Sequence, residues 1–114
     1  MKNISHADSC SVGSSVDAVK VSVTFRGAHT GSFEVERNGN ILPPNADGTV
    51  SVGAASTLRG SSILVTTLVT RIGPGTLFEV DYVVQGAMGG PFTVQDSFAS
   101  NDPDVTLEQT ITFN

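Results

Sequence analysis

The chain has 114 residues, a formal net charge of −5 and a single cysteine, Cys10. The length predicts one domain with a core of its own, and the lone cysteine excludes an internal disulfide. The acidic balance and the scattering of six basic residues exclude a nucleic-acid binder. Apolar runs all fall short of the ~20 residues that a membrane helix needs, so we expect no membrane insertion.

Residues 1–17 are polar, contain five serines and show no periodicity. We predict a flexible N-terminal segment there and a single β-sandwich domain over residues 18–114. The segment lacks the apolar stretch of a signal peptide. The sequence leaves the location of the protein unknown, with an extracellular or cell-surface place favoured.

Beyond residue 17, apolar and polar residues alternate in short runs separated by Gly, Pro, Asn and Asp. Val19, Val21, Val23 and Phe25 show the period of two that is typical of strands with one buried face. The runs predict strands at about 18–26, 32–37, 40–42, 49–55, 61–70, 76–85, 92–99 and 104–113. This spacing predicts an all-β fold, an antiparallel β-sandwich of about seven to eight strands, immunoglobulin-like or jelly-roll-like. No stretch shows a helical period.

The first two predicted strands are separated by residues 27–31, whose flanking glycines suit a hairpin. A hairpin here would place Glu34 and Glu36 on the same outer face as Lys20 and Arg26. We therefore interpret the two glutamates as cross-strand partners of basic residues rather than as a catalytic pair.

Local sequence also predicts where the next strand begins and ends. Asn38-Gly39 is the dipeptide of a type I′ turn, and Pro43-Pro44 ends the short strand after it, because proline has no N–H to donate.

Three predicted strands depart from simple alternation. Residues 61–70 are apolar at both parities, which predicts a central strand covered on both faces or an edge hidden by an interface. Asp96 and Gln109 fall at inward positions of their strands. Each is either an inward polar group with a partner or the mark of a β-bulge.

Motifs for catalysis or metal binding do not stand out. The histidines His6 and His29 and the thiol of Cys10 lack the convergent spacing of a zinc site. An enzyme using Asp96 with Glu79 or Asp81 is the alternative that we weigh, but no nucleophile, base and oxyanion donors come together. We therefore expect a protein that is not an enzyme.

One group of loops suggests a ligand site. If successive strands alternate in direction, the turns at 38–47, 71–75 and 100–104 meet at one end of the sandwich. The predicted ligand-binding residues there are Asn38, Asn40, Asn45, Asp47, Asn101, Asp102 and Asp104. Such oxygen-rich loops hold Ca²⁺ or sugar hydroxyls. Since Asn and Asp are also ordinary turn residues, we expect no cofactor, with Ca²⁺ as the alternative.

The stretch from Gly73-Pro74-Gly75 to Phe92-Thr93-Val94-Gln95-Asp96, about a quarter of the chain, resembles bacterial immunoglobulin-like surface repeats. Its motifs are general to β-sandwiches, and the Cys…Trp…Cys framework of antibody-type domains is absent. The resemblance implies a fold and a surface context, not a site.

The sequence leaves two functions open. The first is a non-enzymatic binding or adhesion module, with carbohydrate as the ligand at the Asn/Asp-rich loop end. The alternative is a structural or assembly subunit, such as a fibre, shell or spacer domain, with no small-molecule site. The partners that we expect are a glycan or a protein, and a homo-oligomer is consistent with either function.

Overall fold

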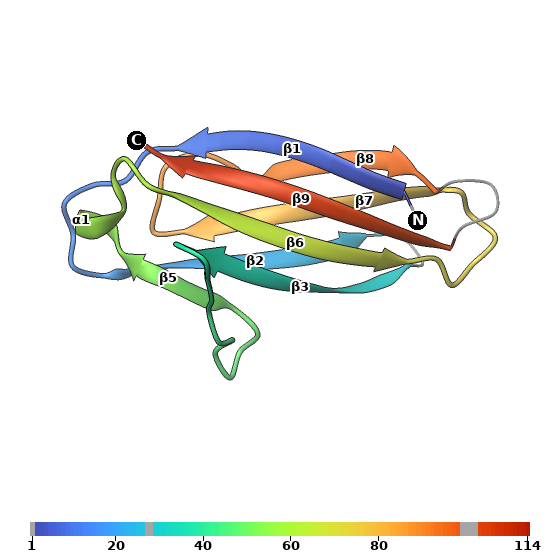
Figure 1. Ribbon diagram of the computed structural model, residues 1–114, viewed down its shortest axis with the longest axis horizontal. Coiled ribbons are helices and arrows are strands. Elements are labelled where there is room, and N and C mark those ends of the chain that lie inside the picture. Colours follow the sequence, from blue (N-terminus) through green and yellow to red (C-terminus); the bar gives the residue numbers. More distant parts are fainter. Residues whose placement is uncertain (1, 27–28, 99–102) are drawn as a thin grey trace.

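The computed structural model describes residues 2–26, 29–98 and 103–114. Over these residues the chain forms nine strands and one short helix (Figure 1). In chain order they are β1 (Lys2–Cys10), β2 (Ala18–Arg26), β3 (Thr30–Arg37), β4 (Asn40–Ile41), β5 (Val50–Ala54), α1 (Ala55–Leu58), β6 (Ser62–Thr70), β7 (Leu77–Gln85), β8 (Phe92–Ser97) and β9 (Asp104–Phe113). The predicted all-β class is confirmed.

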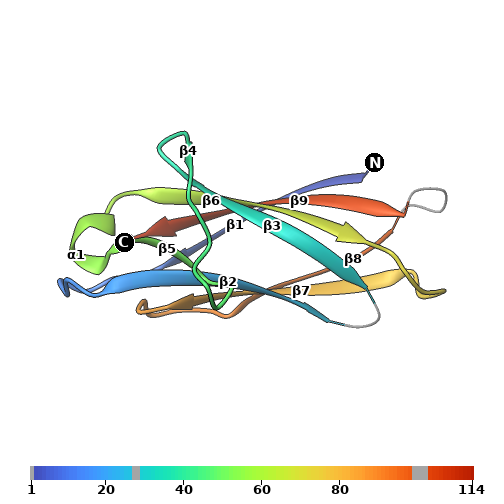
Figure 2. The same cartoon turned by 90° about the horizontal axis from the view of Figure 1, so that it is seen from below.

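The strands form two sheets, which lie one above the other in Figure 2. The larger sheet has the order β1-β9-β6-β3-β4, and the smaller sheet has the order β5-β2-β7-β8. Every pairing within the sheets is antiparallel except that of β1 with β9, which is parallel. Both sheets are therefore antiparallel-rich, as the alternating sequence predicted.

The hydrophobic core lies between the inner faces of the two sheets. Val35, Val65 and Ile111 of the larger sheet and Val21 and Val80 of the smaller sheet are each at most 1% exposed. Burial of such side chains is the main stabilising contribution to folding.

One polar contact crosses the core. The hydroxyls of Thr67 in β6 and Tyr82 in β7 lie 2.9 Å apart, and both residues are fully buried. Burial raises the pKa of the Tyr82 phenol, so the hydroxyl stays protonated and satisfied by Thr67.

The N-terminal segment differs from the sequence-based expectation. Residues 1–17 were expected to be flexible, whereas Lys2–Cys10 forms β1, paired along its whole length with β9. Its inward positions mix the apolar Ile4 and Cys10, which contact the core, with the polar Lys2, His6 and Asp8, so the strand carries no regular apolar alternation. Val12 follows as a buried anchor whose N–H donates to the carbonyl of Asn114.

The predicted hairpin between β2 and β3 is wrong. β2 pairs with β5 and β7, whereas β3 pairs with β4 and β6, so the chain crosses from one sheet to the other between β2 and β3. Glu34 and Glu36 consequently lie opposite Thr66 and Leu64 of β6 rather than beside Lys20 and Arg26. A short loop rich in glycine fits a crossing between sheets as well as a hairpin.

The strand predicted at 61–70 is central, since β6 lies between β3 and β9. It is not covered on both faces by the described residues, because Leu64 is half-buried and Leu68 is 37% exposed on the outer face. Before β6 comes α1, a single helical turn that the sequence did not predict, held at Ser56 by the carbonyl of Ser15. Among the described residues there is no helix long and apolar enough to span a membrane.

Both breaks in the alternation are inward polar groups with partners, and the strand register is continuous at each. Asp96 accepts a hydrogen bond from the Lys2 ammonium at 2.8 Å. Gln109 is 0% exposed, and its Nε2 donates to Asp8 Oδ2 at 2.8 Å. The bulge alternative is wrong at both positions.

Candidate functional site

The structure does not bring the predicted Asn/Asp-rich loops together. β3 begins beside the start of β9, because Thr30 pairs with Thr70 and Thr70 with Asp104. Asn38 and Asn40 follow the other end of β3, so Asp104 lies at the opposite end of the sheet from them. Asn101 and Asp102 lie outside the described residues. The chain turns back at 38–39 and forms β4, which has only two residues. It then crosses to β5 in the other sheet.

The remaining members of the predicted site are used within their own turns. Asn38 and Gly39 both have positive φ, of 53° and 80°, which confirms the type I′ turn. Asn45 Nδ2 donates to Thr49 Oγ1 and Ser51 Oγ at 3.1 and 3.0 Å. Asp47 Oδ1 accepts from the backbone N–H and the hydroxyl of Thr49, and the hydroxyl bond is the first cause of a lowered pKa of Asp47. These side chains stabilise turns rather than point toward one another.

Within the described ranges, no three His, Cys, Asp or Glu side chains lie close enough together to hold a metal ion. His6 Nδ1 lies 3.5 Å from Asp8 Oδ2. His29 is buried, with Nε2 at 3.0 Å from the Leu77 carbonyl and its ring in edge contact with Phe98. Cys10 is buried beside Gly89, and burial raises the pKa of its thiol, which disfavours the reactive thiolate.

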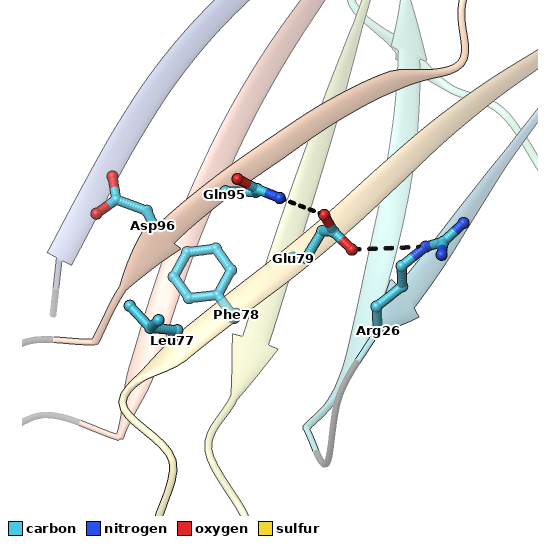
Figure 3. A pocket seen from close by; sticks show the side chains of 6 residues that line it. All are labelled: Arg26, Leu77, Phe78, Glu79, Gln95 and Asp96. Carbon is cyan, nitrogen blue, oxygen red and sulfur yellow. Dashed lines mark hydrogen bonds and ion pairs between the residues drawn. The ribbon is translucent and has the colours of Figure 1, made fainter.

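A polar groove of about 470 Å³ lies on β7 and β8 near the end of β2 (Figure 3). Its polar side chains form cross-strand contacts. Gln95 Nε2 donates to Glu79 Oε1, and Arg26 Nε lies 3.7 Å from Glu79 Oε2. Leu77, 71% exposed, and Phe78 are its apolar components. Planar polar groups beside an exposed apolar side chain can bind sugar hydroxyls, but here these groups already satisfy one another.

Next to the groove, Asp81 of β7 forms hydrogen bonds to both neighbouring strands. Its carboxylate accepts hydrogen bonds from Thr93 Oγ1 of β8, at 2.7 Å, and from Arg26 Nε of β2. The bond from Thr93, followed by that from Arg26, lowers the pKa of Asp81. This arrangement supports the strand register, and it leaves the carboxylate engaged as a hydrogen-bond acceptor.

The carboxylates weighed as an enzymatic pair do not converge. Asp96 lies opposite Phe78 and shares its inner face, whereas Glu79 and Asp81 share the outer face. Asp96 is also held by Lys2 across the edge of the sandwich. Glu79 and Asp96 both line the groove of Figure 3, but they belong to opposite faces of the sheet and are held by Gln95 and Lys2 respectively.

The arrangement that does stand out is a pair of unpaired strand edges on one side of the molecule, low in Figure 1 and facing the reader in Figure 2. β5 pairs with β2 only over 18–21, and β4 pairs with β3 only at Glu36 and Arg37. The outer edges of Ser22–Arg26 and Thr30–Glu34 therefore have no strand partner among the described residues. We call these two edges the open seam.

Pro43-Pro44 explains the unpaired edge of β3. The Leu42 N–H donates to the Val35 carbonyl at 2.9 Å, and the chain then leaves the sheet at the prolines. Because backbone groups alternate in direction along an antiparallel strand, the N–H and C=O of Gly31 and Phe33 face the same side as the Val35 carbonyl. Those backbone groups lie at the open seam.

Core side chains lose cover at the open seam. Val19 and Val21 of β2 are fully buried where β5 covers them, whereas Val23 and Phe25, beyond β5, are only half-buried. Phe33 of β3 is half-buried in the same way. A groove of about 300 Å³ runs beside it; its apolar lining is Phe33, Val35, Ile41, Leu42, Pro43, Pro44 and Val50.

On the opposite side of the molecule, side-chain and backbone hydrogen bonds link the edge strands β1 and β8, although their own outer edges have no strand partner among the described residues. Lys2 of β1 bonds to Asp96 and to the Ser97 carbonyl of β8, and Ser11 and Met88 exchange two backbone hydrogen bonds.

The β5 edge is also modified, because a register shift interrupts its pairing with β2 and the Val52 carbonyl accepts from Arg37 Nη1 at 2.8 Å. Such devices protect strand edges from pairing with other chains, whereas the register of Thr30–Glu34 with β6 is continuous.

Comparisons with protein-family models, curated proteins and solved structures gave no match for this chain. The site therefore rests on its own geometry. Sequence reasoning missed the open seam, although Pro43-Pro44 was a signal that the strand after Gly39 is short.

Proposed function

We propose that this protein is a non-enzymatic binding and assembly module that accepts an extended polypeptide strand at the open seam. The observation that carries the proposal is the unpaired edge of Thr30–Glu34 beside half-buried core side chains. A strand added to a sheet edge gains main-chain hydrogen bonds, and adjoining apolar grooves select its side chains. The groove beside Phe33 provides such a surface.

This proposal favours the assembly role over the carbohydrate role of the Asn/Asp-rich loops, because Asn38 and Asn40 lie at the opposite end of the sheet from Asp104. The two-sheet architecture is consistent with a structural or adhesive role, since immunoglobulin-like and jelly-roll-like domains share this architecture. Which of those two fold types applies stays a prediction, as does an extracellular or cell-surface location.

Carbohydrate binding is a second candidate, favoured by the polar groove of Figure 3. A sugar hydroxyl would replace the hydrogen bond between Gln95 and Glu79, so this function requires an exchange of partners. A glycan array with the native protein and the Gln95→Ala variant tests it. Binding that the variant loses supports the groove, and no binding by the native protein removes it.

A synthetic peptide with the β3 sequence Thr-Gly-Ser-Phe-Glu-Val tests strand acceptance directly. Titrated into ¹⁵N-labelled protein, it should shift the amide resonances of residues 22–26 and 30–34 and leave those of β9 unchanged. The matched control is the same peptide N-methylated at its Gly and Phe, which cannot donate the edge hydrogen bonds. No shift with the unmodified peptide, or equal shifts with both peptides, would overturn the proposal.

A further inference from the structure

We propose that the strand accepted at the open seam is β3 of a second copy of this chain, paired antiparallel about a two-fold axis at Ser32. This inference rests on the proposed function and names its partner. Ser32 is the central residue of the unpaired stretch Thr30–Glu34. A two-fold axis there makes the edge its own complement, which is the commonest symmetry of soluble oligomers.

The backbone groups match in this arrangement. Pairing centred on Ser32 places Gly31 of each copy opposite Phe33 of the other. These are the residues whose N–H and C=O face the open edge, so each Gly31–Phe33 pair exchanges two hydrogen bonds. The pairing stops where β4 begins to occupy the edge, since Leu42 already bonds to Val35. The five unpaired residues of one copy therefore match the five of the other.

Side chains on the inner face also fit. A Cβ atom on Gly31 would lie 2.4 Å from Phe25 Cε1, so the Phe25 ring packs directly over this glycine. Phe33 of the second copy, placed opposite Gly31 on the same face, reaches that ring. Phe25 and Phe33 are both half-buried in the single copy, and their contact across the axis would bury aromatic surface on each side.

On the outer face the pairing avoids like charges. Glu34 lies opposite Thr30 of the second copy, a pair that can form a hydrogen bond, and Ser32 lies opposite its own counterpart. No two acidic side chains in the paired stretch are directly opposed, which would be unfavourable. On the other side of the molecule the edge strands β1 and β8 are linked to each other by Lys2 and Asp96, a contact that the Thr30–Glu34 edge does not have among the described residues.

Disulfide trapping tests the arrangement. Residues directly opposite in a non-hydrogen-bonded antiparallel pair have Cα atoms about 4.5 Å apart, within disulfide range. The Ser32→Cys variant should form a covalent dimer under mild oxidation about tenfold faster than the control Thr66→Cys, on the same outer face of the central strand β6. Both variants retain the buried Cys10, so its contribution cancels. Equal cross-linking in the two variants would overturn the inference.

Sedimentation equilibrium gives a second readout that needs no cysteine. Because the interface is short, we expect a monomer–dimer equilibrium that develops over roughly 10 µM to 1 mM. The Ser32→Glu variant, which opposes like charges across the axis, should weaken the dimer about tenfold, whereas Ser32→Thr should not. A monomer throughout this range, with peptide binding intact, would overturn the second-copy inference and leave the proposed function standing. Loss of both would overturn both.

Discussion

The ammonium of Lys2 lies 2.8 Å from a carboxylate oxygen of Asp96, and this contact joins the first strand of the larger sheet to the edge strand of the smaller one. It links the two sheets on one side of the molecule, whereas on the other side the link from Arg37 to the Val52 carbonyl lies beyond the open seam and leaves the outer edges of Ser22–Arg26 and Thr30–Glu34 unpaired among the described residues. The contrast between these two sides is the main feature of the molecule.

The Lys2–Asp96 pair predicts a pH-dependent contribution to stability. The hydrogen bond from Lys2 lowers the pKa of Asp96, so the stabilisation is present above the ordinary carboxyl value, about 4, and is lost as pH falls through the lowered value. Both side chains are about one-third exposed, so we expect Asp96→Asn to cost about 0.5–1 kcal/mol at pH 7.

Urea unfolding of the native protein and the Asp96→Asn variant at pH 7 and at about pH 2.5 measures this contribution. The difference between the two proteins should shrink in acid. A difference that stays constant, or grows as pH falls, would show that the ion pair does not supply it.

The contact between Asp8 and Gln109 predicts an unequal response to substitution. Gln109 is fully buried, its Oε1 has no hydrogen-bond partner, and its Nε2 depends on Asp8. Asp8→Ala should therefore destabilise the fold by about 1–3 kcal/mol, because it leaves a buried amide unsatisfied. Adding Gln109→Leu to that variant should recover most of the loss. Thermal unfolding of the single and double variants checks this, and additive losses would contradict it.

The space around Gly31, at the open seam, is too small for a side chain. A Cβ atom there would lie 2.2 Å from the Leu68 carbonyl oxygen and 2.4 Å from Phe25 Cε1. Gly31→Ala should therefore destabilise the protein by about 2 kcal/mol or more. Gly13→Ala is the matched control, because nothing lies within 4 Å of its Cβ position. Equal unfolding midpoints for the two variants would show that β3 is packed less closely than described.

Much of the fold was predictable because the alternation depends on burial alone. Val21, Val80 and Ile111 fall at inward positions, and Asn38-Gly39 forms its turn from local backbone preference. The choice of partner strand was not predictable in this way. The 27–31 loop fits both a hairpin and a crossing between sheets, and only long-range packing decides between them.

The expected meeting of the 38–47 turns with Asp104 at one end was wrong for the same reason, since it depended on which strands are partners. The strand β1 was missed because polar residues occupy three of its five inward positions, although Ile4 and Cys10 contact the core. His6 and Asp8 therefore do not show the apolar pattern that reveals other strands. The open seam exists because β5 and β4 pair with only part of β2 and β3. No local sequence pattern predicts where such a pairing ends.

Amide hydrogen exchange at Gly31 and Phe33 tests whether the open seam is an unpaired edge that accepts a strand. In dilute protein these two amides should exchange quickly, whereas the Glu34 amide, directed toward β6, should be protected. In concentrated protein, or with the β3 peptide, the Gly31 and Phe33 amides should become protected as well. Protection of both in dilute protein, or rapid exchange of both under every condition, would contradict the account.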